Sequence, residues 1–277
     1  MSIAPISRAP GACASSQAIA PVRRRVCARY ALPIALAMSC GLLVATTFAP
    51  AAFALEAKAG GSDGAYVIDG VKVYIDPKSF DSTRYMSAPP SGLEEQEERR
   101  IVERWQALRS QQMADRSLSD SKQSIFVFAD VVGADFQPER FPLAAKFFES
   151  VYKTESNLNK QGKERWARMR PPASIPDLKP VGKFENEGSY PSGHATFGWL
   201  AGIVLADMLP EKREAIMNRA REYGLNRVIG GVHFPSDIEA GRILAVACAV
   251  EMRHNKAFLA DFAAARAEVR KGLRLPD

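Results

Sequence analysis

Residues 196–208 read TFGWLAGIVLADM, a stretch in which only Asp207 carries a charge. Apolar side chains occupy nearly every position, so the stretch has no polar face of the kind that a surface helix presents. A helix that is apolar on all sides packs in the interior of a protein. The stretch therefore predicts a buried central helix around which the rest of the fold is arranged.

The flanking segments also carry helical patterns. Ile101, Trp105 and Leu108 recur three and four residues apart on one face, and Ser91 with Glu94 matches a capping box before them. We expect further helices over about 119–134, around Leu143, Phe147 and Val151, from Pro210 to Gly224, over 238–252 and over 256–272. The sequence therefore predicts an all-α fold, a helical bundle.

The region before these helices has a different character. Residues 65–76 read AYVIDGVKVYID and alternate apolar and polar side chains around Asp69-Gly70, a favourable two-residue hairpin turn. The chain on either side is rich in Gly, Pro, Ser and Asp. We expect residues 55–92 to form an N-terminal arm with a small β-hairpin, and residues 93–277 to form the helical domain.

Residues 1–54 have the pattern of a secretory signal peptide. Five arginines and no acidic residue are followed by an uncharged apolar stretch that ends in Ala52-Phe53-Ala54. The alternative is an uncleaved anchor, since the stretch is long enough to span a bilayer. A cleaved signal predicts a periplasmic or secreted protein.

The rest of the chain is close to neutral, because the five leader arginines supply most of the formal net charge of +6. This balance gives no reason to expect nucleic-acid binding. Cys248 is the one cysteine outside the leader, so no internal disulfide is expected. It lies in the apolar run AVACAV, which predicts a buried thiol.

The start of the central helix carries the first candidate site. Residues 190–194 read YPSGH, in which Ser192 is a good N-cap and Gly193 lets the backbone approach a ligand closely. Free amides at a helix start bind anions, and His194 could donate a proton to an anion bound there. An ordinary capped helix with an incidental histidine explains this segment equally well when it is considered alone.

A basic segment precedes it. Lys163 and Arg170 lie seven residues apart, and Arg170 is followed by Pro171 and Pro172. A basic helix face is usually only solvated. However, a rigid proline-rich loop can fix a guanidinium, and arginine gives phosphate two parallel hydrogen bonds.

The third group is Arg227, His233 and Asp237. An imidazole attacks phosphorus through an unprotonated nitrogen, and a carboxylate bonded to the other ring nitrogen fixes that tautomer. Four residues separate His233 from Asp237, and Pro235 starts a helix between them. Contact between the two side chains is therefore expected, although a core histidine beside a capping aspartate is the alternative.

In this order, the segments Lys163-x6-Arg170-Pro171, PSGH at 191–194 and Arg227-x5-His233-x3-Asp237 resemble the three-part signature of the type 2 phosphatidic acid phosphatase (PAP2) superfamily. The surrounding sequence is most similar to the bacterial class A non-specific acid phosphatases. The resemblance runs from about residue 100 to 272 and implies a helical bundle of the PAP2/haloperoxidase type. One position departs from the signature, because Asn226 stands where the family usually has Ser. We expect this change to tune activity and not to abolish it.

The resemblance implies a role for each matching residue. His233 would be the nucleophile that forms a phosphohistidine, Asp237 would hold and polarise it, and His194 would protonate the leaving alcohol and then activate water. The phosphoryl oxygens would be bound by Lys163, Arg170, Ser192, Gly193 and Arg227.

The charge of this set is independently consistent with phosphoryl transfer. The transferred group spreads negative charge over its oxygens, and three fixed cations with a helix N-terminus stabilise that charge. A metal site is hard to assemble when His194 and His233 already have roles and His254 is expected at the surface. We therefore expect no metal and no cofactor.

The expected activity is hydrolysis of small phosphate monoesters with broad specificity and an acidic optimum. A vanadate-dependent haloperoxidase is an alternative, because vanadate mimics phosphate, although this chain is short for that family. A non-catalytic phosphate-binding protein is another. We expect a homo-oligomer, no stable membrane insertion after signal cleavage and no nucleic-acid partner.

Overall fold

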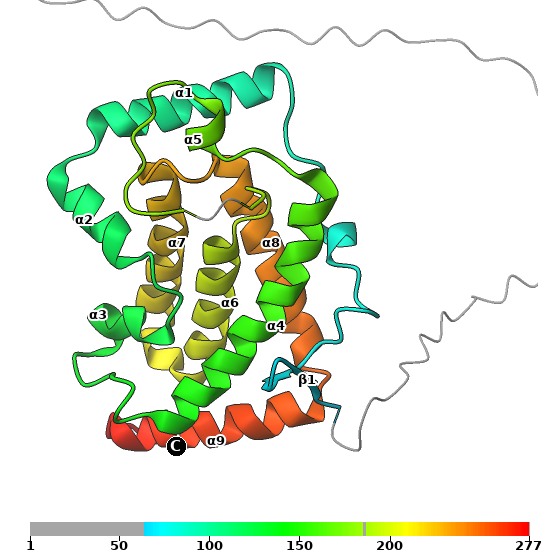
Figure 1. Ribbon diagram of the computed structural model, residues 1–277. Coiled ribbons are helices and arrows are strands. Elements are labelled where there is room, and N and C mark those ends of the chain that lie inside the picture. The colour runs from blue at the N-terminus through cyan, green and yellow to red at the C-terminus, as the bar shows by residue number, and fades with distance from the viewer. Residues whose placement is uncertain (1–63, 185–186, 277) are drawn as a thin grey trace, which may run out of the picture. The chain divides into compact units, whose positions relative to one another are not determined.

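Helix α6 (Gly193–Met208) lies at the centre of the computed structural model, which describes residues 64–184 and 187–276 (Figure 1). It packs against α4 (Pro142–Trp166), α7 (Arg213–Ile229) and α8 (Pro235–Met252). Eleven of its residues are buried, so the prediction of a buried central helix is confirmed. The predicted leader, residues 1–54, lies outside the described residues.

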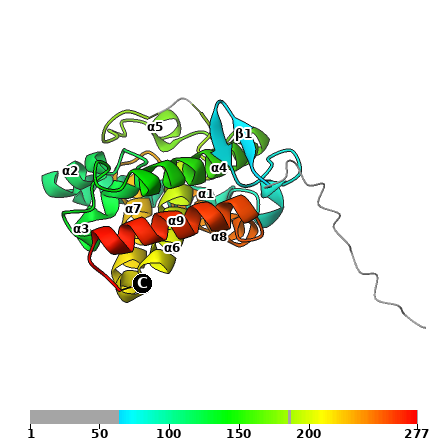
Figure 2. The same cartoon turned by 90° about the horizontal axis from the view of Figure 1, so that it is seen from below.

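Shorter helices cover the ends of this bundle. Helix α9 (Lys256–Gly272) crosses α4 and α6 at one end, which is clearest from below (Figure 2). The remaining helical segments are α1 (Leu93–Leu108), α2 (Gln111–Ser119), α3 (Ala129–Val132), α5 (Pro171–Ser174) and the 3-10 turns Ser82–Tyr85, Ile125–Phe128 and Pro210–Lys212. The all-α expectation is confirmed.

The expected hairpin is also present. Strands β1 (Tyr66–Ile68) and β2 (Val71–Val73) pair antiparallel on either side of Asp69-Gly70. Val73 is fully buried, and β2 packs against α4. The hairpin therefore lies against the bundle.

Two predicted helix boundaries were wrong. Helix α1 has Gly92 at its N-cap, with φ at 63°, and no side-chain cap, so Ser91 and Glu94 form no capping box. Helix α7 continues through Gly224, where we expected an end. That glycine instead allows close packing, since a Cβ there would lie 3.0 Å from Ile238 Cγ2.

The helix expected over about 119–134 is absent as a continuous element. The chain leaves α2 after Ser119, and Ser124 then caps a 3-10 turn by accepting a hydrogen bond from the Phe126 amide. The apolar residues of this stretch include Ile125 and Phe128, which are buried in the main core. Burial therefore explains its composition without a long helix.

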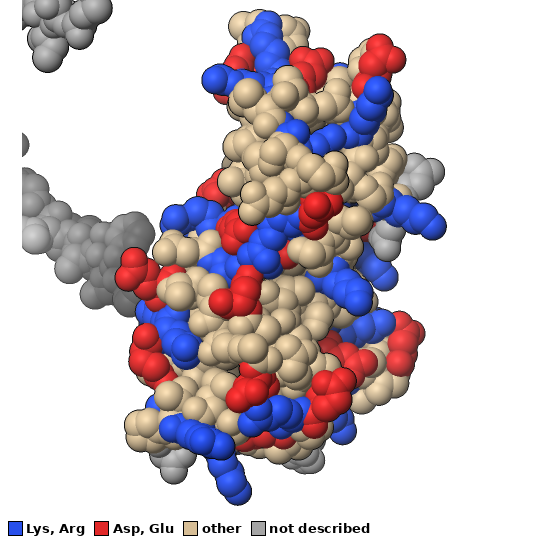
Figure 3. Space-filling view, turned by 90° about the vertical axis from the view of Figure 1, so that its left-hand side faces the viewer, with Lys and Arg blue, Asp and Glu red and all other residues tan. Residues whose placement is uncertain are grey.

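Apolar side chains form the core, and charged side chains lie on the surface. Leu200, Leu205 and Phe197 of α6 join aromatic side chains of α4, and Cys248 is buried as predicted. Lysine and arginine side chains are interspersed with acidic ones on the face shown in Figure 3. Within residues 64–184 and 187–276, no helix combines the length and the apolar character needed to cross a membrane.

Candidate active site

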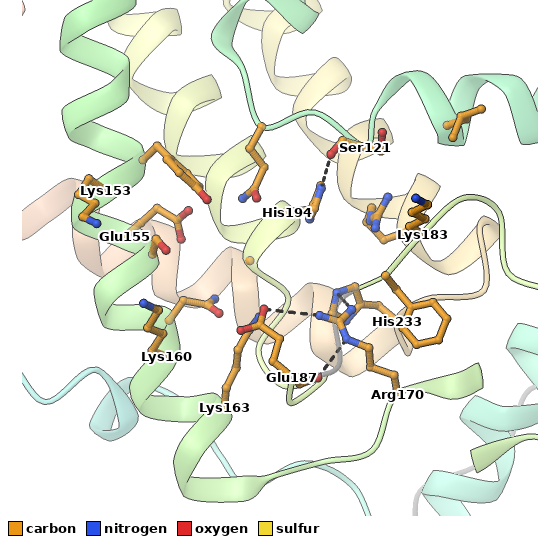
Figure 4. A pocket seen from close by; sticks show the side chains of 18 residues that line it. Ser121, Lys153, Glu155, Lys160, Lys163, Arg170, Lys183, Glu187, His194 and His233 are labelled. Atoms are coloured by element: carbon orange, nitrogen blue, oxygen red, sulfur yellow. Dashed lines mark hydrogen bonds and ion pairs between the residues drawn. The ribbon is translucent and has the colours of Figure 1, made fainter. Parts of the chain in front are cut away.

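One pocket of about 870 Å³ brings together most of the predicted site (Figure 4). Its lining includes Lys163, Arg170, Gly193, His194, Arg227 and His233. These residues come from the end of α4, the segment before α5, the start of α6, the last turn of α7 and the loop before α8. Segments that are distant in sequence therefore meet at one end of the bundle.

His233 and Asp237 are in contact, as their spacing predicted. The ring nitrogen Nδ1 of His233 lies 3.2 Å from Asp237 Oδ2, and both residues are buried. The other nitrogen, Nε2, lies 2.9 Å from Arg170 Nη1. A guanidinium can only donate, so Nε2 accepts and the proton is on Nδ1, facing Asp237. The unprotonated nitrogen thus faces the pocket side.

Asp237 is surrounded by hydrogen-bond donors. It accepts from the Phe234 amide at 2.8 Å, from the Ser189 hydroxyl and from Arg168 Nη1 at 2.7 Å. Burial raises the pKa of its carboxyl, while Arg168 and the hydrogen bonds act in the opposite direction. Because every neighbour donates, the carboxylate form fits this environment.

Arg168 was missed by the sequence analysis, which treated the basic stretch between Lys163 and Arg170 as solvated. Its guanidinium is almost buried, stacks over the Phe234 ring at 4.2 Å and pairs with Glu98 at 2.7 Å as well as with Asp237. Glu98 also accepts from the Ser236 amide at 2.6 Å. This network ties α1 to the start of α8. No pattern in α1 pointed to Glu98.

Arg170 and Arg227 are both buried at the pocket. Arg170 donates to the backbone oxygens of Val232 and Glu187 in addition to its contact with His233. Arg227 forms no ion pair within the described part of the chain, and its Nε has no hydrogen-bond partner there. Burial lowers the pKa of Arg227 to about 10, so the guanidinium stays charged at neutral and acidic pH. Among the described residues, the pocket thus holds a buried cation that has no ion-pair partner.

Lys163 reaches the pocket from the last turn of α4, where its ammonium pairs with the Glu187 carboxylate. Its side chain is only 10% exposed. Desolvation is the main reason that the pKa of Lys163 is lowered, and the nearby Arg170 adds to the effect.

The two histidines share an electrostatic environment. Burial, followed by the charges of Arg170, Arg227 and Lys163, lowers the pKa of His233 well below its usual value. The pKa of His194 is also lowered well below its usual value, first by desolvation and then by Arg227. These shifts favour the neutral form of both rings.

His194 lies in the first turn of α6, and its Nε2 is 2.9 Å from the Ser121 backbone oxygen (Figure 4). Because a carbonyl only accepts, the proton of the neutral ring is on Nε2. Nδ1 is then the unprotonated nitrogen. The ring also stacks on Tyr223, with centroids 6.1 Å apart.

Ser192 lies behind the pocket wall instead of lining it. It is fully buried as the N-cap of α6, where its hydroxyl accepts from the Ala195 amide at 3.3 Å. Its own amide donates to the Asp237 backbone oxygen at 2.9 Å. This contact requires close packing of α8, and a Cβ at Gly241 would lie 2.8 Å from the Ser192 backbone oxygen. Ser192 therefore orients the helix start, while Gly193 lines the pocket.

Asn226 anchors the end of α7. Its side-chain amide donates to Asp120 Oδ2 at 2.7 Å, and its backbone oxygen accepts from the Ser117 hydroxyl at 2.6 Å. Asp120 also pairs with Arg219 inside the protein. The asparagine is thus part of a buried network that holds the helix turn that carries Arg227.

Two acidic residues of the pocket were not predicted. Glu187 contacts the cations Lys163 and Arg170. Glu155 is fully buried on α4, and neither of its carboxyl oxygens has a hydrogen-bond partner among the described residues. Burial raises the pKa of Glu155 well above its usual value. The sequence did contain a signal for Glu155. It lies four residues after Val151, so it falls on the apolar face of the helix.

The predicted surface position of His254 is correct, since its side chain is 73% exposed. Within residues 64–184 and 187–276, no three His, Cys, Asp or Glu side chains lie together in a way that could hold a metal ion. Independence from metals stays a prediction.

Comparisons with known proteins agree with this geometry. Residues 150–258, which include all three motifs, match the model of the PAP2 superfamily. The chain is 28% identical over 183 residues to a non-specific acid phosphatase of Providencia stuartii, covering 62% of this chain and 73% of that protein. It is 30% identical over 151 residues to an acid phosphatase of Zymomonas mobilis, covering 52% and 56%.

A non-specific acid phosphatase of Salmonella typhimurium is 31% identical over 153 residues, covering 52% of this chain and 59% of that protein. The chain thus spans less than two thirds of the Zymomonas and Salmonella proteins. The crystal structure of a transmembrane PAP2 type phosphatidylglycerolphosphate phosphatase from Bacillus subtilis is similar with a TM-score of 0.45 and 20% identity, over 59% of this chain and 86% of that one. The match to the PAP2 superfamily model and the similarity to proteins named acid phosphatases agree with the resemblance that the three motifs carry.

Proposed function

We propose that this chain, whose residues 150–258 match the PAP2 superfamily, hydrolyses phosphate monoesters through a phosphohistidine on His233. The observation that carries the proposal is the buried guanidinium of Arg227, which lines the pocket beside His233 without an ion pair among the described residues. A buried charge without a partner costs several kcal/mol. A phosphoryl group in the pocket supplies the missing anion.

His233 is the nucleophile in this proposal. With the proton on Nδ1 held toward Asp237, the lone pair of Nε2 is available to attack phosphorus. Arg170 now contacts that nitrogen, and it transfers its hydrogen bond to a phosphoryl oxygen when substrate binds. Asp237 then stabilises the imidazolium that forms as the nitrogen–phosphorus bond is made.

His194 is the proton carrier. A bound phosphoryl dianion raises the pKa of His194, because it offsets the cation Arg227 that depresses this pKa in the empty pocket. The protonated ring gives its Nδ1 proton to the leaving alcohol as the ester P–O bond breaks. It then takes a proton from the water that attacks the phosphohistidine, which releases phosphate and restores neutral His233.

The cations and the helix start stabilise the transition state. Lys163, Arg170 and Arg227 converge on the pocket, and the first-turn amides of α6 lack intrahelical partners. Such donors bind the charge that develops on the equatorial oxygens. No step of this scheme needs a metal ion.

Broad specificity and an acidic optimum are also part of the proposal. The pocket of about 870 Å³ is far larger than a phosphoryl group and continues along α4 past Lys160 to Lys153 (Figure 4). This space has room for different leaving groups. The lowered pKa of His233 favours its unprotonated, nucleophilic form as the pH falls, which supports an acidic optimum.

An exported location is proposed from residues 1–54 alone. The pattern of arginines, apolar residues and a small-residue end supports removal of a signal peptide. Determining the N-terminal residue of the protein recovered from the periplasm or the medium tests it. A mature chain that still begins at Met1 contradicts cleavage.

The activity is tested with a chromogenic phosphate monoester from pH 4 to 8, with and without chelator. We expect wild type and the exposed-histidine control His254→Ala to be active in both conditions, and His233→Ala to be inactive. We also expect vanadate to inhibit, and acid-labile phosphate to be trapped on wild type and His254→Ala but not on His233→Ala. Full activity of His233→Ala overturns the mechanism.

Other outcomes favour the rival functions. Loss of activity with chelator indicates a metallophosphatase. Peroxidase activity after addition of vanadate and peroxide indicates a haloperoxidase. Binding of inorganic phosphate without turnover indicates a phosphate-binding protein.

A further inference from the structure

Glu187 places a carboxylate among the cations of the pocket. Its Oε1 pairs with the Lys163 ammonium and lies 3.7 Å from Arg170 Nη2. Figure 4 shows the side chain reaching between these two residues, on the pocket side of His233. The two cations that Glu187 contacts are the ones that the proposed function assigns to the phosphoryl oxygens.

The backbone of Glu187 and of the two residues that follow it is held in this position. Its carbonyl accepts a hydrogen bond from Arg170 Nε at 3.1 Å. The next residue, Gly188, lies so close to α4 that a Cβ there would be 2.9 Å from the Lys163 backbone oxygen. The Ser189 amide then donates to the Arg168 backbone oxygen at 2.8 Å. The carboxylate is therefore presented by an anchored segment.

From these contacts we infer that the Glu187 carboxylate is an internal competitor of the phosphoryl group, and that it sets the affinity of the pocket for phosphate. A carboxylate and a phosphoryl group both present oxygen acceptors to Lys163 and Arg170. Both cannot satisfy the same donors at once, and their like charges repel. Substrate or product phosphate must displace Glu187 to bind fully.

This inference rests on the proposed function and adds a residue that determines affinity for its substrates and product. A built-in anion stabilises the empty pocket, where three cations would otherwise repel one another. It also lowers the affinity of the pocket for the phosphate that hydrolysis produces. Glu187 thus favours product release over tight binding.

The competition depends on the charge of Glu187. Lys163 from α4 and Arg170 from the segment before α5 face the carboxylate, and His233 lies beyond Arg170. Replacing the carboxylate with a neutral amide removes this charge and leaves both cations to phosphate. Phosphate binding is therefore expected to be tighter in a variant without the carboxylate than in wild type.

The test is the affinity of the full chain for inorganic phosphate, measured by calorimetry at pH 7.5. We expect Glu187→Gln to bind phosphate about two- to fivefold more tightly than wild type, in line with the loss of one partly exposed ion pair. In turnover, KM should fall and kcat should not rise.

Glu164→Gln is the matched control, because Glu164 is an exposed acid next to Lys163 in sequence and does not line the pocket. It removes the same charge and should leave phosphate affinity unchanged. Glu187→Ala provides a second variant, with the same expected direction, should the glutamine disturb folding.

Unchanged or weaker phosphate binding in both Glu187 variants overturns the inference, since it means that the carboxylate only orients Lys163 and Arg170. Calorimetry needs no turnover. Failure of the proposed hydrolysis would appear as absent activity in wild type, which is a separate readout.

Discussion

Arg168 and Asp237 form a buried ion pair in which the guanidinium Nη1 lies 2.7 Å from the carboxylate Oδ1. The other carboxylate oxygen faces Nδ1 of His233. Arg168 therefore fixes the orientation of the group that orients the proposed nucleophile. It does so without lining the pocket itself.

Replacement of Arg168 should lower turnover with little effect on substrate binding. A hydrogen bond to a charged group contributes about 1.5–3 kcal/mol, so Arg168→Met should lower kcat about 10- to 100-fold. KM should change little, since no phosphoryl contact is lost. Arg168→Lys should recover part of kcat, because one cationic donor is restored.

The matched control is Arg165→Met, in the last turn of α4. Arg165 is exposed and bonds the Thr83 hydroxyl at 3.2 Å, outside the pocket. A loss in KM instead of kcat, or equal losses in both variants, contradicts a positioning role for Arg168.

The pH dependence of activity should reflect the cations around His233. Burial and the charges of Arg170, Arg227 and Lys163 lower its pKa, so the nucleophile should stay neutral as pH falls below 6.5. Activity should be lost only at lower pH, where the ring takes up a proton. In Lys163→Gln one of these charges is removed, and the acid limb of kcat/KM should move to higher pH.

The measurement is kcat/KM from pH 3.5 to 8 for both proteins on one substrate, since titration of the substrate then affects both profiles alike. Lys160→Gln, one turn earlier on α4, is the control and should leave the limb in place. An acid limb that does not move in Lys163→Gln contradicts the electrostatic account.

The histidine–aspartate contact shows what the sequence could predict. A spacing of four residues and a proline-started helix were sufficient to place His233 against Asp237. Periodicity was sufficient for α4 and α9, and continuous apolar composition for α6 and α8. These features are local, so a short window of sequence contains them.

The partners supplied by distant segments could not be predicted. Glu98 reaches Arg168 from 70 residues away, and no local pattern distinguishes it from the other acids of α1. The role of Glu187 likewise depends on a tertiary contact, because its carboxylate pairs with Lys163 at the end of α4. The expected helix over 119–134 failed for a related reason. Its apolar residues are buried by tertiary packing, and the polar residues between Ser119 and Ser124 end the helical path.

Glu155 should make stability depend on pH. Burial raises the pKa of this carboxyl in the folded state, so below the unfolded-state pKa both states are protonated and no penalty exists. As pH rises, the unfolded state ionises first, and stability is lost until the folded pKa is reached. Glu155→Gln removes this loss, so its Tm relative to wild type should rise between pH 4 and 8.

Each kcal/mol gained should appear as about 2–4 °C in Tm for a domain of this size. Thermal unfolding at several pH values measures the difference, and Glu251→Gln, an exposed acid on α8, is the control. A difference in Tm that is the same at pH 4 and pH 8 means that folding does not raise the pKa of Glu155.

The role of His194 is best tested through the leaving group. An alkyl alcohol is a poor leaving group that needs a proton as its bond to phosphorus breaks, whereas a nitrophenolate leaves readily without one. General acid catalysis typically contributes about 10²- to 10⁴-fold. His194→Ala should therefore lower kcat for an alkyl phosphate by about that factor, and lower the rate of phosphohistidine formation from a nitrophenyl phosphate far less.

His254→Ala controls for loss of a histidine, because that ring is exposed. Single-turnover measurements isolate the first step, since His194 is also expected to activate water in the second. Equal losses on both esters would show that His194 acts by binding the phosphoryl group and not by transferring a proton.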